Sequence, residues 1–333
     1  MNALVQLGLF TAKAAILILM ITLLFVIILA IVSRAKEALK GRIIIKNINE
    51  KYNETKTQLL EIILSKKLFK KFIKQNNAQE KEKLKAAIET PAKNIFVLNF
   101  HGDIKASAVS ALREEVTAIL SVATPRDEVL VTVESGGGMV HAYGLAAAQL
   151  ERIRQKNIPL IVAIDKIAAS GGYMMACVAN KIIAAPFAII GSIGVIVQLP
   201  NFHKLLKEKH IDFEQLTAGN YKRTLTLFGK NTEEGREKLQ QEIEEIHHLF
   251  KNLIHDHRPQ LNIEKIATGE HWLGKQALEL NLVDEIMTSD DYLQQKTESA
   301  NIYEIDYFVK KSFGEKLGQA AQMFKQTLLG NFI

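Results

Sequence analysis

The sequence contains a single cysteine, Cys177, among its 333 residues. One thiol excludes an intramolecular disulfide and any metal site built from several cysteines. Cys177 lies in an apolar run that indicates a buried helix, so it is a weak candidate nucleophile. The His-Glu-x-x-His pattern of zinc peptidases and the Gly-rich phosphate loops of nucleotide enzymes are also absent. We therefore expect neither a metal nor a cofactor.

Positive charge is distributed unevenly along the chain. The formal net charge is +6, yet residues 34–88 alone hold 15 Lys or Arg against 6 Asp or Glu. This basic segment follows an apolar stretch, a position that favours a lipid surface over a nucleic-acid groove. No aromatic-rich basic motif of the RNA-binding kind accompanies it. We expect the lipid bilayer to be one partner and expect no nucleic acid.

The apolar stretch consists of 20 uncharged residues, 14–33, between Lys13 and Arg34. At about 1.5 Å per residue, a helix of this length spans about 30 Å, the thickness of a bilayer core. A cleaved signal peptide would have a shorter apolar core and a basic start. We therefore predict one transmembrane helix and single-pass localisation in the plasma (inner) membrane. The basic residues after this helix place the main domain in the cytoplasm by the positive-inside rule.

From residue 91 onward, strand-like apolar runs alternate with helical patterns. The runs 94–104, 127–135 and 159–166 each precede a segment with helical periodicity. This alternation predicts an α/β fold with a parallel sheet flanked by helices. The expected organisation is an N-terminal flank (1–13), a transmembrane anchor (14–33), a basic helical stalk (34–90), an α/β domain (91–290) and an amphipathic tail (291–333).

Small residues follow two of the predicted strands, at the edge where such sheets bind ligands. Ser135 begins the first turn and is followed by three glycines, whose N–H groups could converge on an oxyanion or a phosphate. An ordinary turn explains this pattern equally well. In the second turn, Ser170 precedes Gly171 and Gly172 at the start of a helix. Its hydroxyl could act as a nucleophile near the positive end of the helix dipole, or could simply cap the helix.

A nucleophilic serine needs a base, and the pattern alone does not identify one. The histidines are isolated or lie in and after a charged segment, and many lysines compete for the role. Ser192, in the run Gly-Ser-Ile-Gly, is a rival nucleophile, although a hydrogen bond within a turn is the simpler interpretation.

Five segments together carry a family resemblance: ESGGGMVHAYGLAAAQL, DKIAASGGYMMACVANKI, IGSIGVI, YKRTLTLFGKNTEEGREK and GEHWLGKQALELNLVDEI. They resemble the signal peptide peptidase family, SppA and SohB, and look most like its SohB branch. The resemblance covers roughly residues 1–290 and implies a ClpP/crotonase-like fold with a Ser–Lys dyad. The family's nucleophile falls on Ser170 and its lysine on Lys222. The family's first turn is usually Ser-Pro-Gly-Gly, and with glycine in place of that proline we expect the N–H groups of Gly137 and Gly171 to form the oxyanion hole.

The resemblance also implies a serine endopeptidase that acts on membrane-associated or unfolded peptides such as signal-peptide remnants. In short relatives a neighbouring subunit supplies the lysine, which implies a homo-oligomer with active sites at its interfaces. Signal peptide peptidases suggest an extracytoplasmic domain, so the side of the membrane stays open. Two alternatives use the same fold: a crotonase-like acyl-CoA enzyme with the glycine turn as its oxyanion hole, and a non-catalytic membrane scaffold.

Overall fold

The computed structural model describes residues 13, 18–20, 22–23, 25, 41–89, 92–219 and 221–309, and only the backbone of 79–89. The chain divides into two compact units. One comprises residues 45–306, and the other comprises 1–44 together with 307–333. The larger unit contains both predicted turns and all of the sheet except residues 42–44 and 307–308, and it is the unit described below.

A mostly parallel sheet forms the centre of this unit, with the strand order β1-β10-β2-β3-β4-β6-β9. Three short strands lie off this path: β5 pairs with β3 and β7, and β8 pairs with β7 in antiparallel orientation. The strands are β1 (Arg42–Asn47), β2 (Lys93–Gly102), β3 (Glu128–Ser135), β4 (Leu160–Ile164), β5 (Ile167–Ala169), β6 (Lys181–Ala184), β7 (Ile189–Gly191), β8 (His271–Leu273), β9 (Glu285–Ile286) and β10 (Ala300–Phe308).

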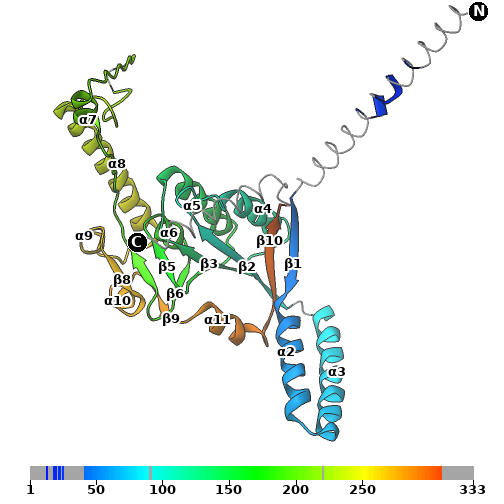
Figure 1. The fold of residues 1–333 in the computed structure, drawn as a ribbon. Helices are drawn as coiled ribbons and strands as arrows, with labels where there is room; N and C mark the ends of the chain where they lie inside the picture. Colours follow the sequence, from blue (N-terminus) through cyan, green and yellow to red (C-terminus); the bar gives the residue numbers. More distant parts are fainter. Residues whose placement is uncertain are drawn as a thin grey trace, which may run out of the picture. The chain divides into compact units, whose positions relative to one another are not determined.

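Helices α4, α5 and α6 pack against one another and cover the central strands (Figure 1). The helices are α2 (Ile48–Ile63), α3 (Lys66–Glu89), α4 (Val109–Leu120), α5 (Val140–Gln155), α6 (Gly171–Ala176), α7 (His203–Glu208), α8 (Glu233–His257), α9 (Ile263–Ile266), α10 (Gly274–Glu279) and α11 (Ser289–Lys296). In Figure 1, α8 runs from the sheet outward to α7.

The central strands are continuous apolar runs because both of their faces are covered. All residues of β4 are buried, and Leu98, Leu130 and Val162 have no exposed surface. A strand of a parallel sheet is buried in this way when helices pack on both faces. The predicted α/β fold with a mostly parallel sheet is therefore confirmed.

Two segments differ from the organisation expected along the chain. Residues 42–47 form β1 and residues 300–308 form β10, whereas the sequence pattern assigned them to the stalk and the tail. The helical pattern of the stalk corresponds to α2 and α3. The predicted amphipathic tail helix beyond residue 309 lies outside the described residues.

The prediction of a transmembrane helix and single-pass membrane localisation is contradicted. Among the residues that the structure describes, no helix is both long enough and apolar enough to cross a bilayer. Most of the predicted anchor, 14–33, lies outside those residues. The prediction relied on the length and the uncharged, apolar composition of the segment, and composition does not fix the conformation of a segment.

Candidate active site

The two glycine turns lie together at one edge of the sheet. Strands β3 and β5 are parallel, and Ser135 is the register partner of Ala168. A Cβ atom on Gly137 would lie 2.6 Å from the backbone nitrogen of Gly171 and 2.8 Å from the Cβ of Ser170. The turns are therefore in direct contact, and at Gly137, which also has a positive φ of 89°, only glycine permits that contact.

Ser170 joins β5 to α6 in a strained conformation. Its φ is 52° and its ψ is −118°, a combination that residues with a side chain rarely adopt. Its N–H donates to the carbonyl of Gly191 at 2.7 Å. Although Ser170 occupies the N-cap position of α6, its side chain makes no capping hydrogen bond. Helix capping therefore does not explain this serine, and its half-buried hydroxyl is available for other chemistry.

The glycines that follow Ser170 allow very close packing. A Cβ on Gly171 would lie 2.4 Å from the Cγ of Tyr143, and one on Gly172 would lie 2.5 Å from the carbonyl oxygen of Ser135. As the first residue of α6, Gly171 has an N–H without an acceptor inside the helix. This N–H lies beside Gly137.

The N–H of Gly137 itself is engaged. It donates to the Oγ of Ser135 at 3.0 Å, and this bond competes with the oxyanion role predicted for Gly137. The next amide nitrogen, of Gly138, has no hydrogen-bond acceptor within the described part of the chain. The following N–H, of Met139, donates to the carbonyl of Ile104 at 2.8 Å.

Ser192, the rival nucleophile, lies next to Ser170. Strands β5 and β7 are parallel, and Ala169 is the register partner of Gly191, so the two serines follow paired residues. Ser192 also has a φ of 52°, and its N–H donates to the carbonyl of Glu270 at 2.6 Å. The sequence had suggested a turn residue here, and the backbone bond agrees with that interpretation.

Lys222 lies on a connection that contacts the outer end of α8. Its side chain is exposed, in the connection between α7 and α8. Neighbouring residues of this connection contact the start of α8: Lys238 lies over the ring of Tyr221, 5.6 Å from its centroid. The buried part of α8, which includes Phe250 and Ile254, follows about 20 Å further along the axis. Figure 1 accordingly shows α7 and the outer end of α8 well away from α6.

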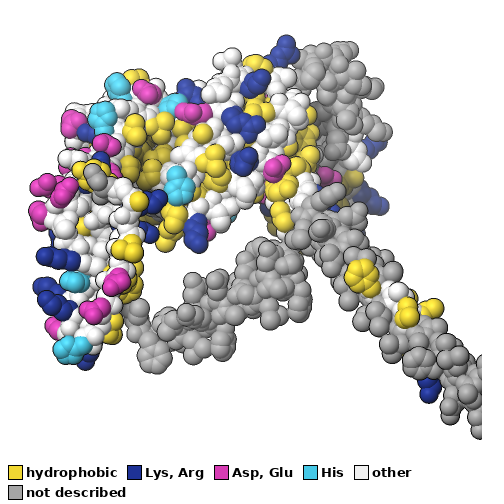
Figure 2. Space-filling model, turned by 90° about the horizontal axis from the view of Figure 1, so that it is seen from above, with side chains coloured by type: hydrophobic (Ala, Val, Ile, Leu, Met, Phe, Trp, Pro, Cys, Tyr) yellow, Lys and Arg dark blue, Asp and Glu magenta, His cyan; other side chains and the backbone are white. Residues whose placement is uncertain are grey.

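The segment around Lys222 exposes many apolar side chains. The ring of Phe228 lies 6.0 Å from Phe202 and 5.8 Å from Phe213, and all three side chains are partly exposed. Leu216 is 96% exposed. Figure 2 shows hydrophobic side chains at the surface on the face seen from above. Such clusters are typical of protein contact surfaces.

Cys177 is excluded as an alternative nucleophile. It has no exposed surface, and its Sγ donates to the carbonyl of Met174. Burial raises the pKa of its thiol to about 12. A thiol that stays protonated and cannot be reached by a substrate does not act as a nucleophile.

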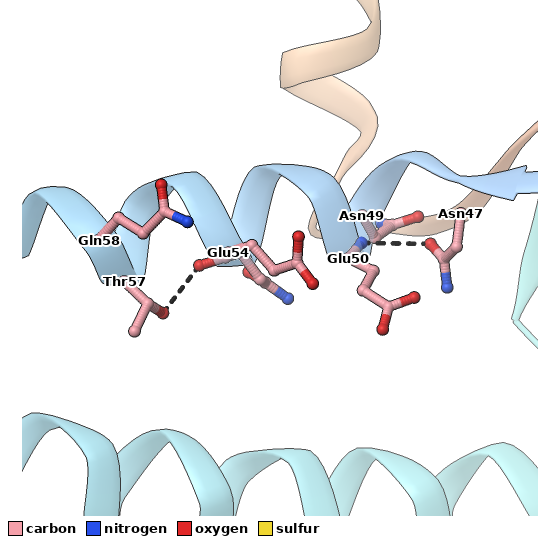
Figure 3. A pocket seen from close by; sticks show the side chains of 7 residues that line it. Asn47, Asn49, Glu50, Glu54, Thr57 and Gln58 are labelled. Carbon is pink, nitrogen blue, oxygen red and sulfur yellow. Dashed lines mark hydrogen bonds between the residues drawn. The ribbon is translucent and has the colours of Figure 1, made fainter.

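A separate cavity of about 760 Å³ lies along α2 (Figure 3). Its lining is made of amide, carboxylate and hydroxyl side chains from one short stretch of chain: Asn47, Asn49, Glu50, Asn53, Glu54, Thr57 and Gln58. Asn49 is already bonded to the carbonyls of Thr297 and Ala300 and to the N–H of Ile302. The cavity contains no residue of the two glycine turns, and its lining offers no nucleophile with a base.

Comparisons with known proteins found matches to two family models and to curated relatives. The model of the N-terminal region of peptidase family S49 matches residues 2–150, and the model of peptidase family S49 matches residues 152–303. A Haemophilus influenzae protein named "Probable protease SohB" is 51% identical over 292 residues, which cover 85% of this chain and 83% of that protein. A protein of the same name from Buchnera aphidicola subsp. Acyrthosiphon pisum is 47% identical over 333 residues, covering 100% and 98%.

Among solved structures, the chain is similar to a 1510-N membrane-bound stomatin-specific protease mutant in complex with a substrate peptide. The TM-score is 0.44 and the sequence identity 14%, covering 68% of this chain and 96% of that chain. The resemblance to SohB and SppA predicted from sequence is confirmed by the curated relatives.

Proposed function

The chain belongs to peptidase family S49, and from this premise we propose that it is a serine endopeptidase with Ser170 as nucleophile and Lys222 as general base. The observation that carries the proposal is the conformation of Ser170. A strained serine without a capping bond, at φ 52°, is held between glycine turns that can accept a substrate carbonyl. Strain of this kind persists only where the surrounding structure imposes it, and it concentrates at functional sites.

In the proposed reaction, the neutral amine of Lys222 accepts the proton of the Ser170 hydroxyl while Oγ attacks the peptide carbonyl carbon. The tetrahedral intermediate collapses when the leaving amine takes that proton, and the acyl group remains on Oγ. Water then hydrolyses the ester with the same lysine as base. An ammonium group cannot accept a proton, so Lys222 must enter an apolar, water-poor environment to act.

The exposed position of Lys222 in one chain supports an active site shared between subunits. We infer a homo-oligomer in which the connection between α7 and α8 of one copy approaches the Ser170 turn of another. The apolar side chains around Phe213 and Phe228 would be covered in such an assembly. Covering them would also provide the dry surroundings that a neutral lysine needs.

The oxyanion hole would combine the N–H of Gly171 with one N–H of the first turn. Gly137 was the expected second donor, yet its N–H is bonded to Ser135. We therefore propose that Gly138 supplies the second donor, because its N–H needs no existing bond to break. Removing one such donor costs about 10²–10³ in rate in well-studied enzymes.

Several finer features belong to the same proposal. The peptidase unit would lie mainly within 91–290 and have a ClpP/crotonase-like fold. Its substrates would be unfolded peptides, with signal-peptide remnants as one class. Membership in a peptidase family disfavours the acyl-CoA alternative.

A fluorophosphonate probe and labelled casein test the proposal. We expect the probe to label Ser170 and casein hydrolysis to disappear in Ser170→Ala and in Lys222→Ala. Ser192→Ala is the matched control, because this serine has the same φ and lies in the neighbouring strand turn. Full activity in Ser170→Ala would overturn the proposed nucleophile, and full activity in Lys222→Ala would overturn the proposed base.

A further inference from the structure

Tyr143 is buried between the two glycine turns and contacts both. Its hydroxyl lies 2.5 Å from the Oγ of Ser135 and donates to the carbonyl oxygen of Asp103 at 2.7 Å. Its ring packs against Gly171, where an added Cβ would lie 2.4 Å from Cγ. The phenol therefore bonds to the turn after β3, and the ring contacts the turn after β5.

The directions of these hydrogen bonds follow from the groups present. The single hydroxyl proton of Tyr143 is donated to the Asp103 carbonyl, so Ser135 must donate to Tyr143. The Oγ of Ser135 is then an acceptor for the N–H of Gly137 at 3.0 Å. The result is one continuous relay from the Gly137 amide through two hydroxyls to a backbone carbonyl. Each bond in such a chain polarises the next one and strengthens it.

The surroundings hold Tyr143 in place. Its side chain has no exposed surface, and its ring makes an edge contact with Phe100 at 6.3 Å between centroids. At Gly102, an added Cβ would lie 2.4 Å from the Tyr143 hydroxyl. Burial raises the pKa of the phenol, against a smaller lowering by Ser135, so the hydroxyl stays protonated and remains a donor.

We propose that Tyr143 is a positioning residue for the peptidase reaction, because it fixes the spacing between the Gly136–Gly138 turn and Gly171. The inference rests on the proposed function, in which these turns supply the oxyanion donors. Tyr143 does not touch the reacting atoms. It acts through Ser135 on one turn and through its ring on the other.

The variant Tyr143→Phe keeps the ring and removes only the hydroxyl. Ser135 then loses its acceptor, and the amide of Gly137 loses an ordered partner. A misplaced oxyanion donor slows the reaction less than a missing donor does. We therefore expect kcat on labelled casein to fall about 10-fold, while KM changes by less than about twofold. The affinity for the peptide aldehyde acetyl-Leu-Leu-norleucinal should fall by the same factor as kcat/KM, because its hemiacetal oxygen occupies the oxyanion site.

Ser135→Ala is the second variant, and it interrupts the same relay from the other side. The two changes interrupt one relay, so their effects should not add. The kcat of the double variant should lie within about twofold of the kcat of the less active single variant. The matched control is Tyr292→Phe, which removes a buried hydroxyl bonded to Glu128 at 2.6 Å, at the opposite end of β3. Concentrations of active sites are set by fluorophosphonate titration, so that a misfolded fraction cannot imitate a loss of kcat.

An unchanged kcat in Tyr143→Phe, with Ser170→Ala inactive, would overturn the positioning role while leaving the proposed function intact. An equal loss in Tyr292→Phe would also overturn it, because a general loss of packing would then explain both. Full activity in Ser170→Ala would instead overturn the proposed function, and this inference with it. A loss of kcat and of aldehyde affinity confined to Tyr143→Phe and Ser135→Ala supports the inference.

Discussion

The backbone N–H of Ser170 donates a 2.7 Å hydrogen bond to the carbonyl oxygen of Gly191. The φ angles of both residues are positive, 52° and 107°, and each residue lies at the end of a short parallel strand. Because the bond joins the strained Ser170 to a backbone position that only glycine adopts readily, the conformation of the proposed nucleophile depends on a glycine in the next strand.

Replacing Gly191 with alanine should therefore disturb Ser170. Alanine is strained at this φ, and its Cβ would lie 2.7 Å from the Trp272 ring and 3.1 Å from the carbonyl oxygen of Glu270. We expect the free energy of unfolding in urea to fall by about 1–3 kcal/mol. We also expect fluorophosphonate to label Ser170 more slowly than in the wild type.

Gly144→Ala provides the control for this substitution. Gly144 lies inside α5, and no atom lies within 4 Å of an added Cβ. Alanine in a helix interior is favoured over glycine by about 0.5–1 kcal/mol, so this variant should gain stability and keep its labelling rate. Unchanged stability and labelling in Gly191→Ala would contradict the coupling between the two strand ends.

A second prediction concerns the pair formed by Arg258 and Asp284. The guanidinium, whose side chain is 3% exposed, donates to both carboxylate oxygens at 2.7 and 2.8 Å. The carboxylate also accepts the N–H of Ile182 at 2.7 Å. Burial acts to raise the pKa of Asp284, but the hydrogen bonds from Arg258 and Ile182 outweigh it and lower the pKa.

Because its folded-state pKa is lowered, Asp284 stabilises the fold above its unfolded-state pKa of about 3.9. That stabilisation is lost as the pH falls through the folded-state pKa. Asp284→Asn should reduce the free energy of unfolding at pH 7 by about 2–3 kcal/mol, since it leaves a buried cation unpaired. Urea unfolding between pH 7 and pH 3 should show the wild-type and variant curves converging in acid.

The exposed carboxylate Asp256 supplies the matched control. Asp256→Asn, on the last turn of α8, should change stability by less than about 0.5 kcal/mol across the same range. A constant gap between wild type and Asp284→Asn down to pH 3 would show that the carboxylate charge is not what stabilises this region.

A third prediction concerns the attachment of α8 to α5. The Nδ1 of His257 lies 2.9 Å from Arg154, and its Nε2 lies 2.8 Å from Glu151. Arginine only donates, so Nδ1 is the acceptor and Nε2 carries the proton that Glu151 accepts. We expect His257→Ala to lower the free energy of unfolding by about 1–2 kcal/mol, because two partly buried partners lose their bonds.

The exposed His248, whose Nδ1 lies 3.2 Å from the side-chain amide of Asn252 on the same helix, is the control for this variant. His248→Ala should leave the thermal midpoint within about 1 °C. Equal midpoints for the two variants would show that His257 does not anchor α8. Because α8 carries the connection that contains Lys222 at its outer end, we also expect slower casein hydrolysis in His257→Ala.

The sequence was informative about the sheet because local signals determine it. The apolar runs that became β2, β3 and β4 could be recognised without any partner, and the glycine turns followed directly from strand ends. Strand β10 was assigned to the tail, because a strand at residues 300–308 joins the sheet through β1 and β2, which lie 200 or more residues earlier in the chain. A single sequence contains no signal for such a pairing.

The site was only partly predictable for a similar reason. Ser170 and Gly171 stood out as small residues after a strand, whereas Lys222 came from the family resemblance alone, since its position depends on a long connection. The relay through Tyr143 and Ser135 was missed entirely. It depends on which face of α5 meets β3, and nothing in the helical pattern distinguishes Tyr143 from an ordinary core residue.

The fourth prediction tests whether two subunits complete one site. Ser170→Ala keeps the lysine and Lys222→Ala keeps the serine, so each pure variant should be inactive. If a neighbouring copy supplies the lysine, mixed oligomers contain some sites in which an intact serine meets an intact lysine. With random equal mixing around a closed ring, about one quarter of sites are complete. Casein hydrolysis should then return to about one quarter of the wild-type rate.

The mixture is prepared by unfolding both variants together in urea and refolding them, and each variant refolded alone is the control. Ser192→Ala refolded with Lys222→Ala separates complementation from mere refolding. In this mixture every Ser170 is intact and the fraction of complete sites equals the share of Ser192→Ala, so the rate should be proportional to that share. No activity in the Ser170→Ala and Lys222→Ala mixture, despite mixed oligomers in native mass spectrometry, would place both residues of the dyad in one chain. The connection between α7 and α8 would then have to fold back toward its own Ser170, which the packing of Thr224 against Gly235 at the start of α8 opposes.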